Sequence, residues 1–209
     1  MSYDMDFADD LDEVGGDYLN DPGVYHLMVE EVREGVGQKG TAIDGFSVSC
    51  IVRAGTTQDC AGKSVDLGFF SPNYSKGDKS VASTKRQNTA FALATNLIDP
   101  NAMGTKATIE LKNAEGCQLV VKLNRKMDKD PVTEEWTVPS KFLQISYSDI
   151  WHVDDPAAEK HPKDATAIAV IPKAFRRAAE WFAFKAKKGA VAAPAQAKPA
   201  PPASDFSSL

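Results

Sequence analysis

The chain has 209 residues, of which 43% are hydrophobic and 25% are charged, a composition typical of a globular protein of one domain. No apolar run approaches the roughly 18 residues that a membrane-spanning helix needs, and the acidic N-terminus lacks the pattern of a secretory signal. Three cysteines without a CxxC pair argue against a disulfide framework and predict a reducing compartment, the cytoplasm.

Charge is distributed unevenly along the chain, whose net charge is -5. Residues 1–22 hold eight acidic and no basic side chains, residues 23–170 hold 17 basic and 19 acidic ones, and residues 171–209 hold seven basic and two acidic ones. We expect residues 1–21 to be an acidic, mostly disordered tail, residues 22–188 to fold, and the Ala/Pro-rich residues 189–209 to be a flexible tail. The acidic segment is either a solubility tail or a polyanion that competes with a partner for a basic groove.

Most of the expected domain shows the period-two alternation of strands that bury one face. In the third such segment, for example, Val65, Leu67 and Phe69 share one side. The predicted strands are residues 24–33, 46–53, 64–70, 107–111, 117–123 and 142–147.

Two segments have helical spacing instead. Residues 84–98 carry apolar side chains at helical intervals after Thr84, which is the expected N-cap, and residues 172–188 place Pro172 in the first turn and lysines in the last. The pattern predicts a mainly β protein: a small OB-like Greek-key barrel with one helix between strands three and four and a C-terminal helix.

Motifs that would indicate a cofactor or catalysis fail on their spacing. Residues 35–40 match GxGxxG, but a strand follows where a dinucleotide site needs the start of a helix. Residues 62–64 have the wrong preceding loop for a phosphate-binding loop, and residues 128–139 lack the glycine and the glutamate of a calcium loop. We therefore expect no cofactor, no metal site and no enzymatic activity.

Cations and aromatic rings coincide near the ends of the predicted strands. This combination binds single-stranded nucleic acids, because cations neutralise phosphates and planar rings stack on bases. Each residue alone is better explained by packing or by a solvated surface than by binding, so the prediction depends on their co-occurrence. The predicted nucleic-acid-binding residues are Arg53, Phe70, Tyr74, Lys76, Lys79, Lys85, Arg86, Lys122, Arg125, Lys126 and Trp136.

Five segments that together cover about residues 22–155 carry a family resemblance. They read GVYHLMVEEV, GFSVSCIVRAGTTQDCAGKSVDLGFF, KRQNTAFALATNL, AEGCQLVVKL and FLQISYSDIWHVDDP. In this layout the chain resembles phage-type single-stranded-DNA-binding proteins built on one OB-fold. The resemblance implies non-enzymatic binding and protection of single-stranded DNA in phage or plasmid replication and recombination, in the bacterial host cytoplasm and without a membrane.

The family also tends to end in an acidic tip with an aromatic residue that recruits replication or recombination proteins. The resemblance thus implies a partner-binding tail at Asp205 and Phe206, although here one acid precedes the aromatic residue and three residues follow it. Two other interpretations stay open: a β-rich virion structural or adaptor protein, and an accessory domain of an enzyme.

Overall fold

The computed structural model describes residues 18–38, 40–57, 59–99, 108–177 and 181. The predicted tail residues Asp205 and Phe206, and most of both predicted tails, lie outside this part of the chain. Everything below refers to the described residues.

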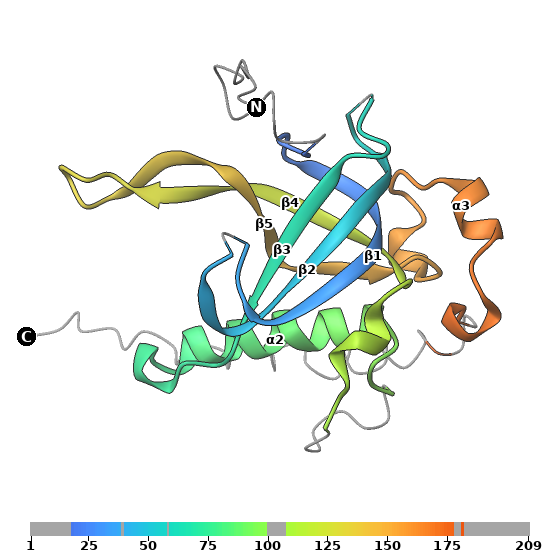
Figure 1. Cartoon of the computed structure of the whole chain (residues 1–209), viewed down its shortest axis with the longest axis horizontal. Coiled ribbons are helices and arrows are strands. Elements are labelled where there is room, and N and C mark those ends of the chain that lie inside the picture. The colour runs from blue at the N-terminus through green and yellow to red at the C-terminus, as the bar shows by residue number, and fades with distance from the viewer. Residues whose placement is uncertain (1–17, 39, 58, 100–107, 178–180, 182–209) are drawn as a thin grey trace, which may run out of the picture.

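One antiparallel sheet organises the fold, with its strands in the order β3-β2-β1-β4-β5 (Figure 1). Strands β4, β1, β2 and β3 are neighbours in the spatial order that defines a Greek key, and β5 extends that set beyond β4. The predicted mainly β, OB-like class is therefore confirmed. The strands are β1 (Gly23–Val36), β2 (Ala42–Gly55), β3 (Ser64–Phe70), β4 (Gln118–Lys129) and β5 (Trp136–His152).

The sheet curls, but backbone pairing does not close it into a barrel. Strands β3 and β5 stand at the two ends of the strand order. The side chain of Gln38, in the β1–β2 loop, joins them: its Nε2 donates to the carbonyl oxygens of Asp66 in β3 at 2.6 Å and of Leu143 in β5 at 2.9 Å. One side-chain amide thus bridges the two edges at a position where a closed barrel would have a ladder.

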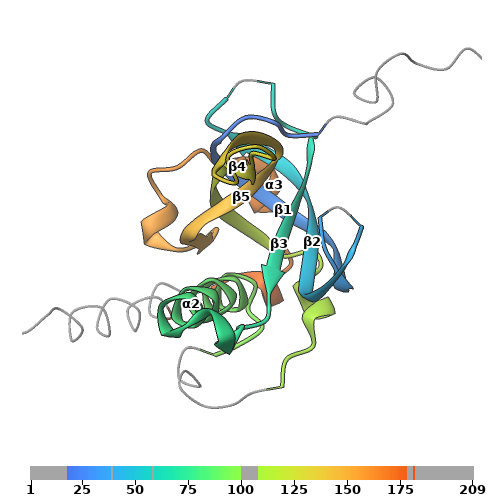
Figure 2. The ribbon, with the colours of Figure 1, turned by 90° about the vertical axis from the view of Figure 1, so that its left-hand side faces the viewer.

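The core fills the inside of the curl with the residues that the alternation predicted. Tyr25, Leu27 and Val65 are among the buried side chains contributed by the strands. Helix α2 (Asp78–Ala94) covers one end of the core, beneath the sheet in Figures 1 and 2. Its Phe91 ring packs on the stacked rings of Phe46 and Phe69, with centroid distances of 5.5 and 4.6 Å. The helix is therefore anchored by an aromatic cluster.

Helix α2 begins at Asp78, six residues before the predicted Thr84. The 3₁₀ turn Tyr74–Lys76 leads directly into it, and an acidic side chain in the first turn suits the helix dipole. The helix ends before Leu97 because Thr95 caps it and Asn96 has a positive φ of 62°. Among the described residues, no helix combines the length and the apolar character needed to cross a membrane.

The predicted strand at residues 107–111 is wrong. Residues 108–110 are not in a strand, and Leu111–Ala114 is a 3₁₀ turn. The turn is held against β1, because Gly116 donates its N–H to the carbonyl oxygen of Val29 at 2.9 Å and the Glu115 carboxylate accepts from the N–H of Val32 at 3.1 Å. These hydrogen bonds fix the segment beside β1, both edges of which already pair with β2 and β4.

A segment after β5 returns across the outer face of the sheet. It contains the short helix α3 (Ala165–Ala169) and the 3₁₀ turn Lys173–Phe175. The predicted helix does not begin at Pro172, because Arg176 is extended; Trp181 is helical, and the rest of the prediction lies outside the described residues.

Two buried histidines hold this returning segment. Asp164 donates its N–H to Nδ1 of His26 at 3.1 Å, and Asp154 donates its N–H to Nδ1 of His152 at 3.0 Å. Both rings are therefore neutral with the proton on Nε2, which donates to Gln118 from His26 and to the carbonyl oxygen of Phe175 from His152. Protonation of either Nδ1 would place its new hydrogen against the hydrogen of the backbone N–H that donates to it, and the hydrogen bond would be lost.

We expect the stability of the protein to fall with acidification between about pH 7 and about pH 5. Burial lowers the pKa of both His26 and His152, although the carboxylates of Asp164 and Asp154 oppose this effect. The unfolded chain, in which histidine titrates at about pH 6.5, then binds more protons than the folded one, so stability is full above that pH and is lost below it. Urea midpoints measured across this range test the expectation. In a His152→Gln variant the urea midpoint should change less with pH. A wild-type midpoint that does not change with pH would contradict the account.

Candidate nucleic-acid interface

A groove of about 490 Å³ lies where β3, α2 and the β4–β5 hairpin meet, at the seam bridged by Gln38. Within the part of the chain that the structure describes, no Asp or Glu lines it and Lys126 is its one charged lining residue, although the chain as a whole is acidic. The groove is lined by Gln38, Gly68, Phe70, Ser83, Gln87, Asn124, Lys126, Gln144, Ile145 and Ser146.

Phe70 forms the aromatic rim of the groove. It ends β3, where alternation places Phe69 in the core and leaves Phe70 52% exposed. Its carbonyl oxygen accepts a hydrogen bond from Asn88 Nδ2 at 2.9 Å, which ties the end of the strand to α2. Across the ladder lies Gly45, where an added Cβ would stand 2.1 Å from the carbonyl oxygen of Phe69. The backbone around Phe70 is therefore tightly fixed.

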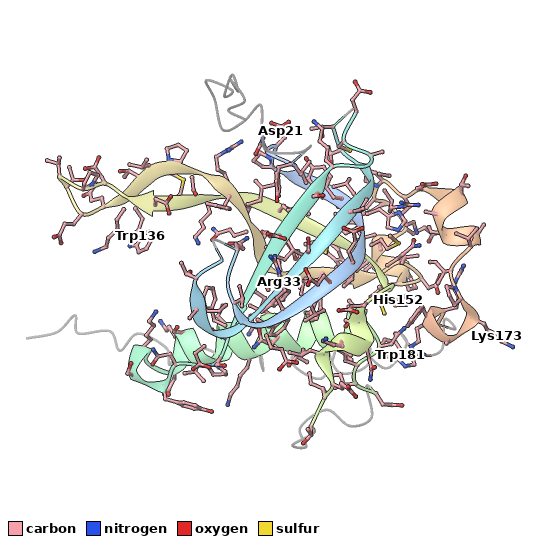
Figure 3. The ribbon with its side chains drawn as sticks, viewed as in Figure 1. Asp21, Arg33, Trp136, His152, Lys173 and Trp181 are labelled. Carbon is pink, nitrogen blue, oxygen red and sulfur yellow. The ribbon has the colours of Figure 1, made fainter. Side chains whose placement is uncertain are left out.

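The β4–β5 hairpin supplies the opposite wall. Asn124 and Gln144 are directly opposed in the antiparallel register and both are exposed. Lys126 follows on β4, and beyond it the hairpin projects from the body of the sheet as an arm (Figure 1). Trp136 lies on this arm, opposite Lys129, and is 64% exposed (Figure 3).

Helix α2 supplies the third wall through Ser83 and Gln87. Lys79 and Arg86 stand four residues before and three residues after Ser83, which is the spacing of side chains on one helix face. Both are exposed. Two further cations thus flank the groove without lining it.

The structure separates Tyr74, Lys76 and Lys85 from the groove. Lys85 is two residues from both Ser83 and Gln87, a spacing that puts it on the other side of the helix. Its Nζ lies 5.3 Å from the centroid of the Tyr74 ring, so Tyr74 shares that far side. Lys76 follows Tyr74 in the same 3₁₀ turn.

Three other predicted cations have different neighbours. Arg125 donates to the carbonyl oxygens of Asn20 at 2.6 Å and Ser140 at 3.3 Å, which fixes the segment before β1. Arg53 is half-buried beside His26, where its charge adds to burial in lowering the pKa of the ring. Lys122 lies near His161, whose pKa is lowered mainly by burial and then by nearby lysines. We therefore remove Arg53, Lys122 and Arg125 from the candidate groove.

The loop at the tip of the arm, residues 130–135, is an ordinary polar hairpin end. Asp130 Oδ1 accepts from the N–H groups of Val132 at 2.7 Å and Thr133 at 3.0 Å. These hydrogen bonds lower the pKa of the Asp130 carboxyl. Over the described ranges, no three His, Cys, Asp or Glu side chains are grouped so as to hold a metal ion.

Removing either exposed ring should leave the free energy of unfolding nearly unchanged, because Tyr74 is 72% exposed and Trp136 is 64% exposed. We expect Trp136→Ala to weaken binding of a dT oligomer by about 1–3 kcal/mol through lost stacking. Tyr74→Ala should have a smaller effect, because its ring lies across α2 from the groove. Fluorescence anisotropy and urea denaturation measure the two quantities. Early unfolding of Trp136→Ala with normal DNA binding would show that this ring is structural.

The groove amides are the residues that sequence reasoning missed. Gln38, Gln87, Asn124 and Gln144 are neutral and polar, so on a strand or helix they look like any solvent-facing residue. The alternation of residues 142–147 did put Gln144 on the solvent side, which was the available signal. Their convergence depends on the curl of the sheet and on the position of α2.

No family model, curated protein or solved structure matches this chain. The groove therefore has to be interpreted from its own chemistry: one exposed ring, four carboxamides, one lining cation, two flanking cations and no acid. These groups can hold a ligand through stacking, hydrogen bonds and charge.

Proposed function

We propose that this protein binds and protects single-stranded DNA, without catalysis, in phage or plasmid replication and recombination in the cytoplasm of a bacterial host. The observation that carries the proposal is a groove in an acidic chain whose described lining residues include no acid, with Phe70 at its rim and Lys126 in its wall. The resemblance to phage single-stranded-DNA-binding proteins supports the same function.

The chemistry of the groove favours a single strand over a duplex. A base stacked on an exposed aromatic ring contributes about 1–3 kcal/mol, and only an unpaired, unstacked base offers its face. Lys79, Arg86 and Lys126 supply positive charge around the ring for the phosphates. The groove is lined in part by the β1–β2 loop and by the β4–β5 hairpin, and OB-folds bind oligonucleotides with the loops at these places and the adjacent strand face.

The proposal is tested by anisotropy titrations of a labelled dT oligomer and a duplex of the same length at low salt. We expect tighter binding to the single strand, and a loss of affinity in Lys126→Ala. Lys173→Ala is the matched control, because it removes the same charge from an exposed position at the other end of the molecule (Figure 3). Tighter duplex binding, or equal losses in the two variants, would contradict the proposal. No binding to either probe would favour the virion structural or adaptor interpretation.

Recruitment of replication or recombination proteins through Asp205 and Phe206 is a separate proposal that rests on the family resemblance. Deleting residues 204–209 should abolish capture of such a partner while DNA binding is kept. Capture that survives the deletion would locate the partner surface elsewhere.

A further inference from the structure

We infer that the groove recognises unpaired nucleobases by hydrogen-bonding their Watson–Crick edges with side-chain carboxamides. This inference rests on the proposed function and names the part of the DNA that the groove reads. Four of the side chains that line it are carboxamides: Gln38, Gln87, Asn124 and Gln144.

These amides come from four separate elements and converge on one space. Asn124 and Gln144 are opposed in the β4–β5 register, where side chains on one face stand about 5 Å apart. Gln87 faces the same groove from α2, and Gln38 enters it from the β1–β2 loop. Each element contributes one of the four lining amides, so the cluster arises from the tertiary fold.

The orientation of the Gln38 amide follows from its partners. Both groups that it contacts, at Asp66 and Leu143, are carbonyl oxygens, so the atom facing them must be the NH₂ group. These two hydrogen bonds use the two hydrogens of that group, and the carbonyl oxygen of the side chain is left as the acceptor. Gln38 therefore presents a fixed acceptor at the seam, whereas the exposed Asn124 and Gln144 are free to turn.

A carboxamide suits the Watson–Crick edge of any base. It carries a donor beside an acceptor, and each base edge also presents a donor next to an acceptor. A half-turn of the amide matches either order, so a side chain that is free to turn, such as Asn124 or Gln144, pairs with all four bases. In a duplex these edges are already paired and unreachable. Carboxamides therefore select single strands while imposing little sequence preference.

The remaining lining groups agree with a nucleotide better than with a peptide or a small anion. Phe70 offers a plane for the face of the base, and Lys126 offers one cation for a phosphate. Among the described residues no carboxylate lines the groove, so a phosphate bound there would not contact one. A small anion would use few of the neutral donors and acceptors that make up most of the wall.

The inference is tested with an oligomer of 2,4-difluorotoluene nucleotides, which keeps the shape and stacking of thymine but hydrogen-bonds very weakly. We expect the wild-type protein to bind a dT oligomer about tenfold or more tightly than this isostere, as one or two lost hydrogen bonds predict. The double variant Asn124→Leu with Gln144→Met keeps side-chain size and should lose most of this preference, because Gln38 and Gln87 are then the amides that remain to contact a base edge. Gln87→Met should show part of the same loss. Asn113→Leu, at an exposed position in the 3₁₀ turn Leu111–Ala114, is the control.

The outcomes separate the inference from the proposed function. Equal wild-type affinity for dT and the isostere would overturn edge recognition and leave binding by stacking and charge intact. Failure of the wild type to bind dT even at low salt would overturn the proposed function and the inference with it. The comparison of the two oligomers on the wild-type protein does not depend on how any variant folds.

Discussion

Replacing Phe91 with alanine is expected to lower the free energy of unfolding by about 3–5 kcal/mol, the largest stability loss that we predict for one substitution. Phe91 is 1% exposed, and its ring packs on Phe46 and Phe69 at the end of the core. Its removal would leave a cavity between α2 and the sheet. The favourable packing of the Phe91 ring on the other two rings would also disappear, which adds to that cost.

Urea denaturation followed by circular dichroism measures this loss. Phe70→Ala is the matched control. The Phe70 ring, on β3, is half-exposed, so its removal should lower the free energy of unfolding far less. If Phe91→Ala unfolded at the wild-type midpoint, the cluster would not anchor α2. The helix wall of the groove would then need another explanation.

Affinity for a dT oligomer should fall about 100-fold between about 50 mM and about 500 mM salt. Lys79, Arg86 and Lys126 surround the groove, and each phosphate contact on a single strand contributes about -0.7 to the slope of log affinity against log salt. Three such phosphate contacts give a slope of about -2. This is the largest change in binding that we expect from a change of conditions.

The same titrations on variants assign the slope to residues. Lys126→Ala should make the slope less negative by about 0.7, and Lys173→Ala should leave it unchanged. A flat salt response of the wild-type protein would contradict phosphate neutralisation. An equal change in both variants would show that net charge matters and the groove does not.

The sequence predicted the fold best where a strand buries one face. Strand β3 has the predicted limits, residues 64–70, because Val65, Leu67 and Phe69 all face the core. The projecting arm was missed: β4 and β5 run beyond the predicted residues 117–123 and 142–147. Much of this part of the hairpin lies outside the core, so burial imposes little alternation there, and backbone pairing alone extends the strands.

The candidate site was partly predictable, for the same physical reason. Phe70 was predicted because it ends a strand beside a loop rich in cations, and Lys126 because it lies in a cluster of cations at the tip of another strand. Which cations gather in one place depends on tertiary position: Arg125, beside Lys126, instead holds the backbone at Asn20. Local sequence does not distinguish these two neighbours.

The central claim, that single-stranded DNA occupies this groove, is tested most directly by photocrosslinking. A single-stranded oligomer containing 5-bromodeoxyuridine is irradiated with the protein, and the modified peptides are identified by mass spectrometry. We expect adducts at Phe70 and on the arm near Lys126 and Trp136, and their loss in the presence of excess dT. Adducts confined to the far end of the molecule, around Trp151 and Lys173, would contradict the account.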